Sequence, residues 1–457
     1  MIRLDIVILA AGIGKRMCSA LPKVLHKLAG KPLLLHVLDT AKGLSPDKIC
    51  VVHGHGGELV RSVIDDSGLV WIEQAQQLGT GHALKQAIPT LHKNGATLVL
   101  FGDVPLVKQE TLELLIKKMQ DDRLVLLTVK LDNPSGYGRI VRDVATGDIQ
   151  AIVEDKDATP AQRAINEINT GIMLLPNKFL SDWLARLDNA NIQGEYYLTD
   201  IIAMAVNDDI RVISASPVDS WEPSGVNNKL QLAELERIYQ LEYAKKLMLQ
   251  GTMLADPARI DIRGELNCGN DVEIDVNCIF EGDVHLGDCV KVQANCVLRN
   301  VAIAAGTIVS AFTLIENATI GQNCRIGPYA RIRPGTHLDE AVHIGNFVEV
   351  KNSQISTGSK VNHLSYIGDS QIGRDVNIGA GTITCNYDGA HKHRTIIENN
   401  VFIGSGCQLI APVRVASGAT IGAGSTITRD APAEQLTLSR SRQTSIPNWK
   451  RPQKNHI

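Results

Sequence analysis

The most regular feature of the sequence is an aliphatic residue at every sixth position over much of its second half. The central run consists of Ile320, Ile326, Ile332, Leu338, Ile344 and Val350. Similar runs precede it from residue 286 and follow it as far as residue 427. A 3.6-residue helix or a simple alternating strand does not have a period of six, whereas the hexapeptide repeats of a β-helix do. The pattern therefore predicts a left-handed parallel β-helix whose aliphatic residues fill a prism-shaped core.

The period shortens to five residues at three places, 315–320, 350–355 and 367–372. Real solenoids slip in this way at imperfect corners, and glycine or another small residue after the aliphatic position lets the backbone turn. A chance run in another kind of β-rich domain would not hold its register over so many units. We therefore expect the slips to mark corners of the β-helix.

Apolar strands alternate with helical stretches in the first half of the chain, which is typical of an α/β fold with a Rossmann-like, mostly parallel sheet. The predicted strands cover residues 5–9, 49–53, 70–73, 97–101 and 124–129. The predicted helices include residues 80–92 and 111–119. Ligands of such sheets bind beyond the carboxyl ends of the strands, so the residues that follow each strand are the first candidates for a site.

A stretch without glycine or proline separates the two patterns. It covers residues 228–250 and ends at Gly251, a helix stop signal. At 1.5 Å per residue it predicts a rigid helix about 35 Å long. We expect an α/β domain at 1–227, a linker helix at 228–250, and a β-helix domain with a C-terminal arm at 251–457.

Composition narrows the function classes. The 457 residues include 46 basic and 49 acidic side chains, so nothing points to nucleic acid as a partner. The nine cysteines are scattered singly, as in a reducing compartment. The N-terminal apolar run contains Asp5 and predicts a buried strand rather than a signal peptide, and no segment approaches the length of a membrane span. We expect a soluble, cytoplasmic protein without a membrane partner.

The loop after the first strand contains the first chemical motif. Its sequence is Leu-Ala-Ala-Gly-Ile-Gly-Lys-Arg-Met over residues 9–17, followed by Leu-Pro-Lys at 21–23. Small residues allow backbone N–H groups to approach an anion, and Arg16 and Lys23 add positive charge. The loop matches neither the G-x-G-x-x-G nor the G-x-x-x-x-G-K-[ST] motif. The complete string resembles the signature of sugar-nucleotide pyrophosphorylases, which join a sugar 1-phosphate to a nucleoside triphosphate.

This resemblance implies a UTP- or UDP-N-acetylglucosamine-binding site. The segment 74–83 resembles the family's base-recognition segment, where an amide side chain pairs with uracil. Asp103 and Asn227 correspond to Mg²⁺ ligands, while Arg16 and Lys23 have catalytic roles. The implied nucleotide-site residues are Leu9, Ala10, Ala11, Gly12, Lys23, Gln74, Gly79, Thr80, Phe101, Gly102, Asp103, Gly138, Glu154, Asn169 and Asn227. Phe101 stands where the family pattern has Tyr, so a ring is kept and a hydroxyl is lost.

The second half contains polar residues that a purely structural solenoid does not need. They are Arg333, Lys351, His363, Tyr366, Asn377, Asn386 and Tyr387. The repeat also breaks between residues 381 and 401, where the basic run 391–394 lies. Insertions in solenoids form loops on one face, often the binding face. The sequence therefore predicts a second site on the β-helix.

Both halves together resemble a family of bacterial bifunctional enzymes, N-acetylglucosamine-1-phosphate uridylyltransferases that are also glucosamine-1-phosphate N-acetyltransferases. The resemblance covers the whole chain and implies acetyl-CoA as a co-substrate, a homotrimer with a shared acetyl site, and precursor supply for peptidoglycan and lipopolysaccharide. His363 is the expected general base, because its ordinary pKa of ~6.5 suits removal of a proton from an amine. The implied acetyl-acceptor residues are Arg333, Lys351, Tyr366, Asn377 and Asn386. The implied acetyl-CoA residues are Ala380, Asn386, Tyr387, Ser405, Ala423 and Arg440.

Two alternatives remain open at this point. The chain is a single-activity sugar nucleotidyltransferase with a structural or regulatory β-helix, or an acyltransferase whose N-terminal domain only binds a ligand. His363 and Arg440 argue against the first alternative, and Asp103 and Asn227 argue against the second. Whether Asn386 orients the substrate amine or the imidazole also stays open.

Overall fold

A computed structural model describes residues 3–12, 14–54, 56–120 and 122–454. Ile13 of the glycine loop and the last three residues of the C-terminal arm lie outside the described residues. The chain divides into two compact units, Met1–Tyr239 and Gln240–Ile457. Helix α8 (Lys229–Leu249) contributes residues to both units and matches the predicted helix at 228–250. The domain boundaries expected at 227 and 250 stay a prediction.

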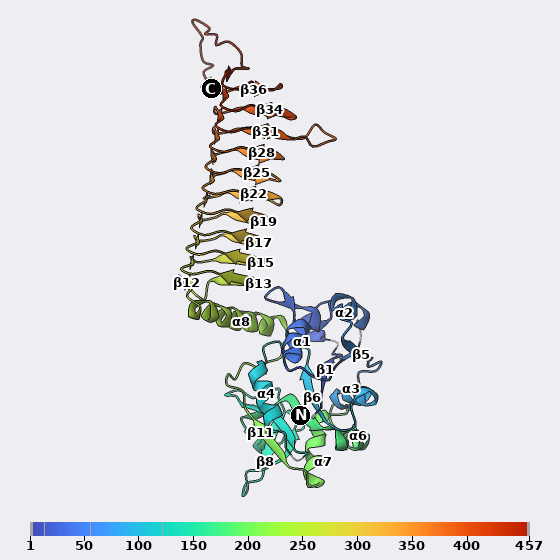
Figure 1. The fold of residues 1–457 in the computed structure, drawn as a ribbon. Helices are drawn as coiled ribbons and strands as arrows, with labels where there is room; N and C mark the ends of the chain where they lie inside the picture. Colours follow the sequence, from blue (N-terminus) through green and yellow to red (C-terminus); the bar gives the residue numbers. More distant parts are fainter. Residues whose placement is uncertain (1–2, 13, 55, 121, 455–457) are drawn as a thin grey trace. The chain divides into compact units, whose positions relative to one another are not determined.

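The first unit is built on one mixed sheet with the strand order β11-β7-β10-β6-β1-β4-β5 (Figure 1). Its strands are β1 (Leu4–Ala10), β4 (Lys48–His53), β5 (Leu69–Glu73), β6 (Ala96–Phe101), β7 (Leu124–Lys130), β8 (Arg139–Arg142), β9 (Ile149–Val153), β10 (Glu167–Pro176) and β11 (Val212–Ala215). The central strands β6, β1, β4 and β5 are parallel, while β10 is antiparallel to both β6 and β7. The five predicted strands and the mostly parallel sheet are confirmed.

Helices cover both faces of this sheet, because its strands are apolar on both sides. They are α1 (Leu33–Gly43), α2 (Gly57–Val63), α3 (Thr80–Ala87), α4 (Gln109–Lys118), α5 (Pro160–Arg163), α6 (Asn177–Arg186) and α7 (Ile201–Asn207). Ile6 and Ile8 of β1 pack in the same core as α1 and α4, whereas Val7 and Leu9 pack in the core with α3, α6 and α7. A small hairpin, β2 (Lys27–Leu28) and β3 (Lys31–Pro32), follows the first loop.

One predicted helix was too long. The helix expected over 80–92 ends at Ala87, and a 3-10 turn follows over Ile88–Thr90. Pro89 explains the early end, because proline has no N–H group to continue the hydrogen-bond series of the helix.

The second unit is a parallel β-helix with three faces (Figure 1). The first face consists of β12 (Met253–Leu254), β14 (Glu273–Ile274), β16 (Lys291–Val292), β18 (Ile308–Val309), β20 (Arg325–Ile326), β23 (His343–Asn346), β26 (Lys360–His363), β29 (Asn377–Ile378), β32 (Phe402–Ile403), β35 (Thr420–Ile421) and β37 (Leu436–Thr437).

The other two faces begin with long strands that turn a corner and later divide into two series. The long strands are β13 (Ile260–Cys268), β15 (Cys278–Leu286), β17 (Val297–Ile303) and β19 (Leu314–Ile320). The second face continues with β21 (Arg331–Ile332), β24 (Glu349–Lys351), β27 (Tyr366–Gly368), β30 (Ile383–Cys385), β33 (Gln408–Ile410) and β36 (Thr426–Ile427). The third continues with β22 (Thr336–Leu338), β25 (Gln354–Ile355), β28 (Ser370–Ile372), β31 (Thr395–Ile397) and β34 (Val413–Val415).

The residues of the six-residue period form one continuous core in this unit. Ile320, Ile326, Ile332, Leu338, Ile344 and Val350 are all at most 1% exposed. The three predicted slips are corners, and each holds one residue with a left-handed backbone, namely Asn317, Asn352 and Asp369 with φ of 45°, 45° and 47°. The repeat therefore has the predicted hexapeptide architecture.

Candidate active sites

A cavity of about 410 Å³ lies at the carboxyl ends of β1, β5 and β6 in the first unit. Ten of the predicted nucleotide-site residues line it: Leu9, Ala10, Ala11, Gly12, Lys23, Gln74, Gly79, Thr80, Phe101 and Asp103. The loop after β1 bends sharply because Gly14 adopts φ +66°, where an added Cβ would lie 2.8 Å from the Cβ of Lys23. The placement agrees with the rule that ligands bind beyond the carboxyl ends of parallel strands.

Two cationic side chains and two side-chain oxygens lie close together next to Lys23 and Asp103 of this cavity. The Lys23 ammonium donates to a carboxylate oxygen of Asp103 and to Oδ1 of Asn227 at 3.3 Å. The Arg16 guanidinium donates to the same Oδ1 at 2.9 Å. The Asp103 and Asn227 oxygens thus converge on a single cationic group, although the two residues are far apart in the sequence. A carboxylate and an amide oxygen that converge in this way fit Mg²⁺, which prefers oxygen ligands.

Asn227 is held in place by contacts of its neighbours. The backbone N–H of Val226 donates to the carbonyl oxygen of Asp103 at 2.9 Å. The backbone N–H of Asn227 donates to Oε1 of Gln231, in the first turn of α8, at 2.8 Å. The fully buried Glu222 ties the preceding loop to α4 by accepting hydrogen bonds from the Thr111 hydroxyl (2.6 Å) and the Lys108 N–H (3.2 Å).

Gln74 lines the same cavity and has a fixed orientation there. Its amide nitrogen lies 3.2 Å from the Gly79 carbonyl oxygen and 3.0 Å from Nδ1 of His82. Gly79 has φ +111°, and an added Cβ would lie 2.6 Å from the Tyr196 carbonyl oxygen. Only glycine fits this position, because both the backbone conformation and the close approach exclude a side chain.

Gly138, Glu154 and Asn169 lie beside one another but do not line this cavity. The Asn169 N–H donates to the Gly138 carbonyl oxygen at 2.8 Å, and an added Cβ on Gly138 would lie 3.4 Å from a Glu154 oxygen. Burial raises the pKa of Glu154, and the nearby Asp200 and Asp157 raise it further, although the Thr199 hydroxyl donates to its carboxylate at 3.0 Å. The Phe101 ring packs against Gly171, two residues after Asn169.

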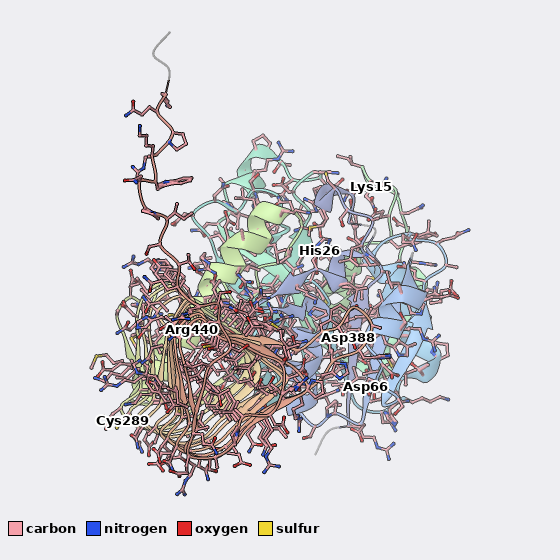
Figure 2. The ribbon with its side chains drawn as sticks, turned by 90° about the horizontal axis from the view of Figure 1, so that it is seen from above. Lys15, His26, Asp66, Cys289, Asp388 and Arg440 are labelled. Carbon is pink, nitrogen blue, oxygen red and sulfur yellow. The ribbon has the colours of Figure 1, made fainter. Side chains whose placement is uncertain are left out.

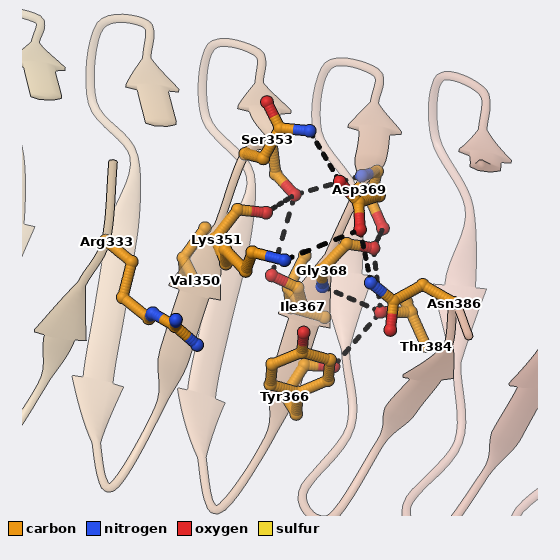
Figure 3. Close-up of polar contacts among 12 residues, drawn as sticks. Arg333, Val350, Lys351, Ser353, Tyr366, Ile367, Gly368, Asp369, Thr384 and Asn386 are labelled. Atoms are coloured by element: carbon orange, nitrogen blue, oxygen red, sulfur yellow. Dashed lines mark hydrogen bonds and ion pairs between the residues drawn. The ribbon is translucent and has the colours of Figure 1, made fainter. Parts of the chain in front are cut away.

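The predicted acetyl-site residues form two groups in the second unit. Lys351, Tyr366 and Asn386 lie around Asp369, with Arg333 on the neighbouring strand (Figure 3). The Lys351 ammonium is 3.9 Å from the Asp369 carboxylate, to which the Asn386 amide also donates. Arg333 donates to Glu349 at 2.7 Å.

At one position on the second face, the charge of the side chain alternates in sign between successive coils that precede the site. Register pairs Arg263 with Glu281, Glu281 with Arg299, and Arg299 with Glu316. Adjacent charges therefore neutralise each other, as in the Arg299–Glu316 pair at 2.7 Å. The alternation continues to Arg333, but the next position is Lys351, so two cationic side chains are adjacent there. Strand neighbours are about 4.8 Å apart, so these two side chains present two positive charges within reach of one phosphate.

The second group lies on the first face. Asn346 pairs with His363, and the same register continues to Ala380, Ser405 and Ala423. The Arg440 guanidinium donates to the Ala423 carbonyl oxygen at 2.8 Å, at the C-terminal end of this column (Figure 2). Small residues leave an open strip between the exposed His363 and Arg440.

The two remaining predicted residues lie near these groups. Asn377 is on the same face, paired with Lys360 and Phe402. Tyr387 is exposed in the loop between β30 and β31, which projects from the coils and contains Asp388 (Figures 1 and 2). Tyr387 pairs with Lys392 across this loop, so the insertion is an ordered hairpin.

Several residues near the sites were missed in the sequence. Gln77 and Glu195 line the first cavity, and Gln77 lies inside the motif that contains Gln74. Thr199 contacts Glu154 from a segment that belongs to none of the predicted motifs. Asp369 had the clearest signal, because it occupies a slip corner where the preceding coil has Asn352.

Family models match three segments of the chain. Residues 6–188 match the MobA-like NTP transferase domain, residues 262–344 match the GMPPB C-terminal domain, and residues 394–429 match six repeats of the bacterial transferase hexapeptide. Together with the fold and the two sites, they define a two-domain transferase with a nucleotidyltransferase unit followed by a hexapeptide unit.

Relatives cover the full length. The chain is 68% identical to the bifunctional protein GlmU of Nitrosomonas eutropha over 456 residues, which is 100% of both chains. It is equally identical, over the same length, to bifunctional protein GlmU of Nitrosomonas europaea. The identity to bifunctional protein GlmU of Nitrosospira multiformis is 64% over 454 residues, 99% of both chains. The chain belongs to the family of bifunctional GlmU proteins.

Proposed function

We propose that the chain makes UDP-N-acetylglucosamine in two steps. The second unit transfers an acetyl group from acetyl-CoA to glucosamine 1-phosphate. The first unit then joins N-acetylglucosamine 1-phosphate to UTP and releases pyrophosphate. The observation that carries the proposal is that each unit has its own set of reactive groups. Lys23, Asp103 and Asn227 converge in the first unit, whereas His363 and the groups around Asp369 lie on two faces of the second.

In uridylyl transfer, a phosphate oxygen of the sugar 1-phosphate attacks the α-phosphorus of UTP, and the bond to pyrophosphate breaks. No protein nucleophile is needed, because the attacking oxygen is already anionic. Asp103 and Asn227 would hold Mg²⁺, which supplies positive charge beside the α-phosphate when bound. Lys23 and Arg16, which donate to these two side chains, then bind phosphate oxygens and stabilise the developing charge.

Substrate recognition follows from the orientation of the polar groups. The Gln74 amide nitrogen points toward Gly79 and His82, so its oxygen is the atom that accepts from N3–H of uracil. Gly138, Glu154 and Asn169 bind the N-acetylglucosamine moiety in this proposal. Their mutual contacts support a common role.

In acetyl transfer, the amine of glucosamine 1-phosphate attacks the thioester carbonyl and the C–S bond breaks. His363 accepts the proton that the amine loses and returns it to the leaving thiolate. Arg333 and Lys351 bind the sugar phosphate, while Tyr366, Asn377 and Asn386 bind the sugar. The strip from Ala380 to Ser405 and Ala423 accommodates the extended arm of coenzyme A, with Tyr387 at one side and Arg440 near its phosphates.

A homotrimer with shared acetyl sites is part of the proposal. His363 lies on the first face of the prism, whereas Lys351 and Tyr366 lie on the second. The outer surfaces of two faces of a prism diverge, so one chain does not direct both groups at one small substrate. Facing chains bring them together. The free cysteines support a reducing, cytoplasmic location, and within the described ranges no helix has the length and apolarity needed to span a membrane.

Separate assays test the two activities. Pyrophosphate release is measured with UTP and N-acetylglucosamine 1-phosphate, and free thiol release with acetyl-CoA and glucosamine 1-phosphate. We expect both from one purified protein. Pyrophosphate release without any thiol release would favour a single-activity nucleotidyltransferase with a structural β-helix.

Complementation tests the shared site. We expect His363→Ala and Lys351→Ala to lose acetyl transfer when each is purified alone. Co-expressed, the two variants form mixed trimers in which about a quarter of the sites combine an intact His363 with an intact Lys351 from another chain. Recovery of about that fraction of activity is the expected result. No recovery in mixed trimers would place the whole site within one chain.

A further inference from the structure

Asp369 occupies a corner of the β-helix that does not itself need a carboxylate. The equivalent corners of the four preceding coils hold Asn300, Asn317, Gly335 and Asn352, with φ between 45° and 78°, and Asp369 has φ 47°. Asparagine and aspartate both tolerate this left-handed conformation. Asparagine is therefore sufficient for the fold, and the negative charge at Asp369 needs another explanation.

The surroundings of Asp369 keep this carboxylate ionised although it is only 8% exposed. Burial acts to raise the pKa of Asp369, but hydrogen bonds from Asn352 and Asn386, with the charges of Lys351 and Lys392, outweigh it and lower the pKa. Both amides donate to the carboxylate, and Lys351 is directed toward it (Figure 3). The charge is thus stabilised by the residues that it touches.

An ionised carboxylate determines how the Asn386 amide is oriented. A carboxylate can only accept hydrogen bonds, so Asn386 must present its NH₂ group to Asp369. The amide cannot flip without placing its oxygen against a negative charge. Its carbonyl oxygen Oδ1 is therefore directed away from Asp369.

We propose that Asp369 is a positioning residue for acetyl transfer, which fixes the Asn386 amide so that Oδ1 accepts a hydrogen bond from the amine of the acetyl acceptor. This inference rests on the proposed function of the second unit. It assigns Asn386 to the substrate amine rather than to the imidazole. Orientation of the amine lone pair toward the thioester carbonyl is a geometric requirement of the attack.

Asp369→Asn is the sharpest test, because it keeps the shape and suits the corner. The variant loses the charge that fixes the amide, so we expect kcat of acetyl transfer to fall about 10- to 100-fold. KM for glucosamine 1-phosphate should stay within about threefold of its original value, because the phosphate-binding cations remain. Uridylyl transfer should not change, and the melting temperature should change by less than about 4 °C. Unimpaired acetyl transfer would overturn the inference.

Two further variants separate positioning from a general structural effect. Asn317→Asp makes the reverse exchange at the same corner two coils from Asn352 and should leave both activities unchanged. In an Asn386→Ala background, Asp369→Asn should lower acetyl transfer by less than about twofold more, since its effect passes through Asn386. If Asp369→Asn lowers acetyl transfer as strongly in the Asn386→Ala background as in the original protein, Asp369 does not act through Asn386 and the inference is overturned.

The same variants distinguish this inference from the proposed function. Unimpaired acetyl transfer in Asn386→Ala would show that Asn386 is not part of the acceptor site. This result would overturn both the inference about Asp369 and the proposed role of Asn386. Impaired transfer in Asn386→Ala together with unimpaired transfer in Asp369→Asn would overturn the inference alone.

Discussion

The two candidate sites are assembled in different ways. In the first unit, Lys23, Asp103 and Asn227 come from three separate segments, which the sheet brings to one edge. In the second unit, Arg333, Lys351 and Asp369 occupy positions that recur in every coil, and neighbouring coils differ only in the side chain there. One site depends on how unlike elements converge, whereas the other depends on substitutions within a repeated framework.

This difference shows where functional residues are visible in each kind of fold. Around a sheet edge, each site segment needs its own backbone, so the signal is a contiguous motif such as residues 9–23. In a repeat, the backbone is the same everywhere, and the signal is a departure from the pattern. Lys351 interrupts an alternation of Arg and Glu, and Asp369 stands where the four preceding coils have Asn or Gly.

The largest expected effect is that of Asp103→Ala on the first site. The change removes the carboxylate that Lys23 contacts and that would hold Mg²⁺, so uridylyl transfer should fall by at least about 10³-fold. Acetyl transfer should survive, because the second site shares no residue with the first. Both rates are measured on the same purified sample. A joint loss of both activities in a folded protein would contradict two independent sites.

His363→Ala is the corresponding test of the second site. Removal of a general base typically costs about 10²- to 10⁴-fold in rate, so acetyl transfer should fall by that amount while uridylyl transfer continues. His337→Ala provides a matched control, because His337 is an exposed histidine of an earlier coil outside the site. Light scattering should show that His363→Ala remains trimeric. Near-normal acetyl transfer would show that the base lies elsewhere.

The smallest effect concerns two carboxylates that respond to their surroundings in opposite directions. Burial, followed by the charges of Asp188 and Asp157, raises the pKa of Asp200 to about 6, whereas the pKa of Asp369 is lowered. Asp200 therefore binds its proton more tightly in the folded than in the unfolded chain. Its contribution to stability falls as the pH rises from about 4 to about 6, and the full cost is present above that range.

Asp200→Asn removes this cost. At pH 8 we expect the free energy of unfolding of the first unit to increase by about 1–2 kcal/mol, a value reduced for the partial exposure of the carboxylate. At pH 4 the gain should be close to zero. Urea unfolding followed by tryptophan fluorescence measures it, since Trp71, Trp183 and Trp221 lie in the first unit. An equal gain at both pH values would refute titration of Asp200 as the cause.

The fold was predictable from the sequence to within a few residues at most strand ends, because hydrophobic period is a local property. The helix at 80–92 was overestimated because its apolar pattern continues past Pro89, where the backbone does not. Contiguous motifs placed most of the first site. The Glu222 anchor and the contact from Thr199 to Glu154 were not predictable, since both partners are distant in the chain and only tertiary packing selects them.

The residues of the second candidate site stay a prediction, and their arrangement was not predictable from the sequence. Sequence placed Arg333, Lys351 and His363 in one site without indicating that they lie on two faces of the prism. It also gave no sign that Arg333 is already paired with Glu349. Asp369 was detectable in principle, because a slip corner and a change from Asn to Asp coincide there.

The number of coils also determines the length of the β-helix. Each coil adds one strand spacing of about 4.8 Å along the axis and contacts only its immediate neighbours. The coils before Arg333 carry neutralised Arg–Glu pairs and no predicted site residue, so they set a length rather than a chemistry. Insertion or removal of one whole coil there would move the second candidate site along the axis of the β-helix by one spacing and leave its internal geometry intact. The position of this site along the β-helix axis can therefore be changed without changing the residues that form it.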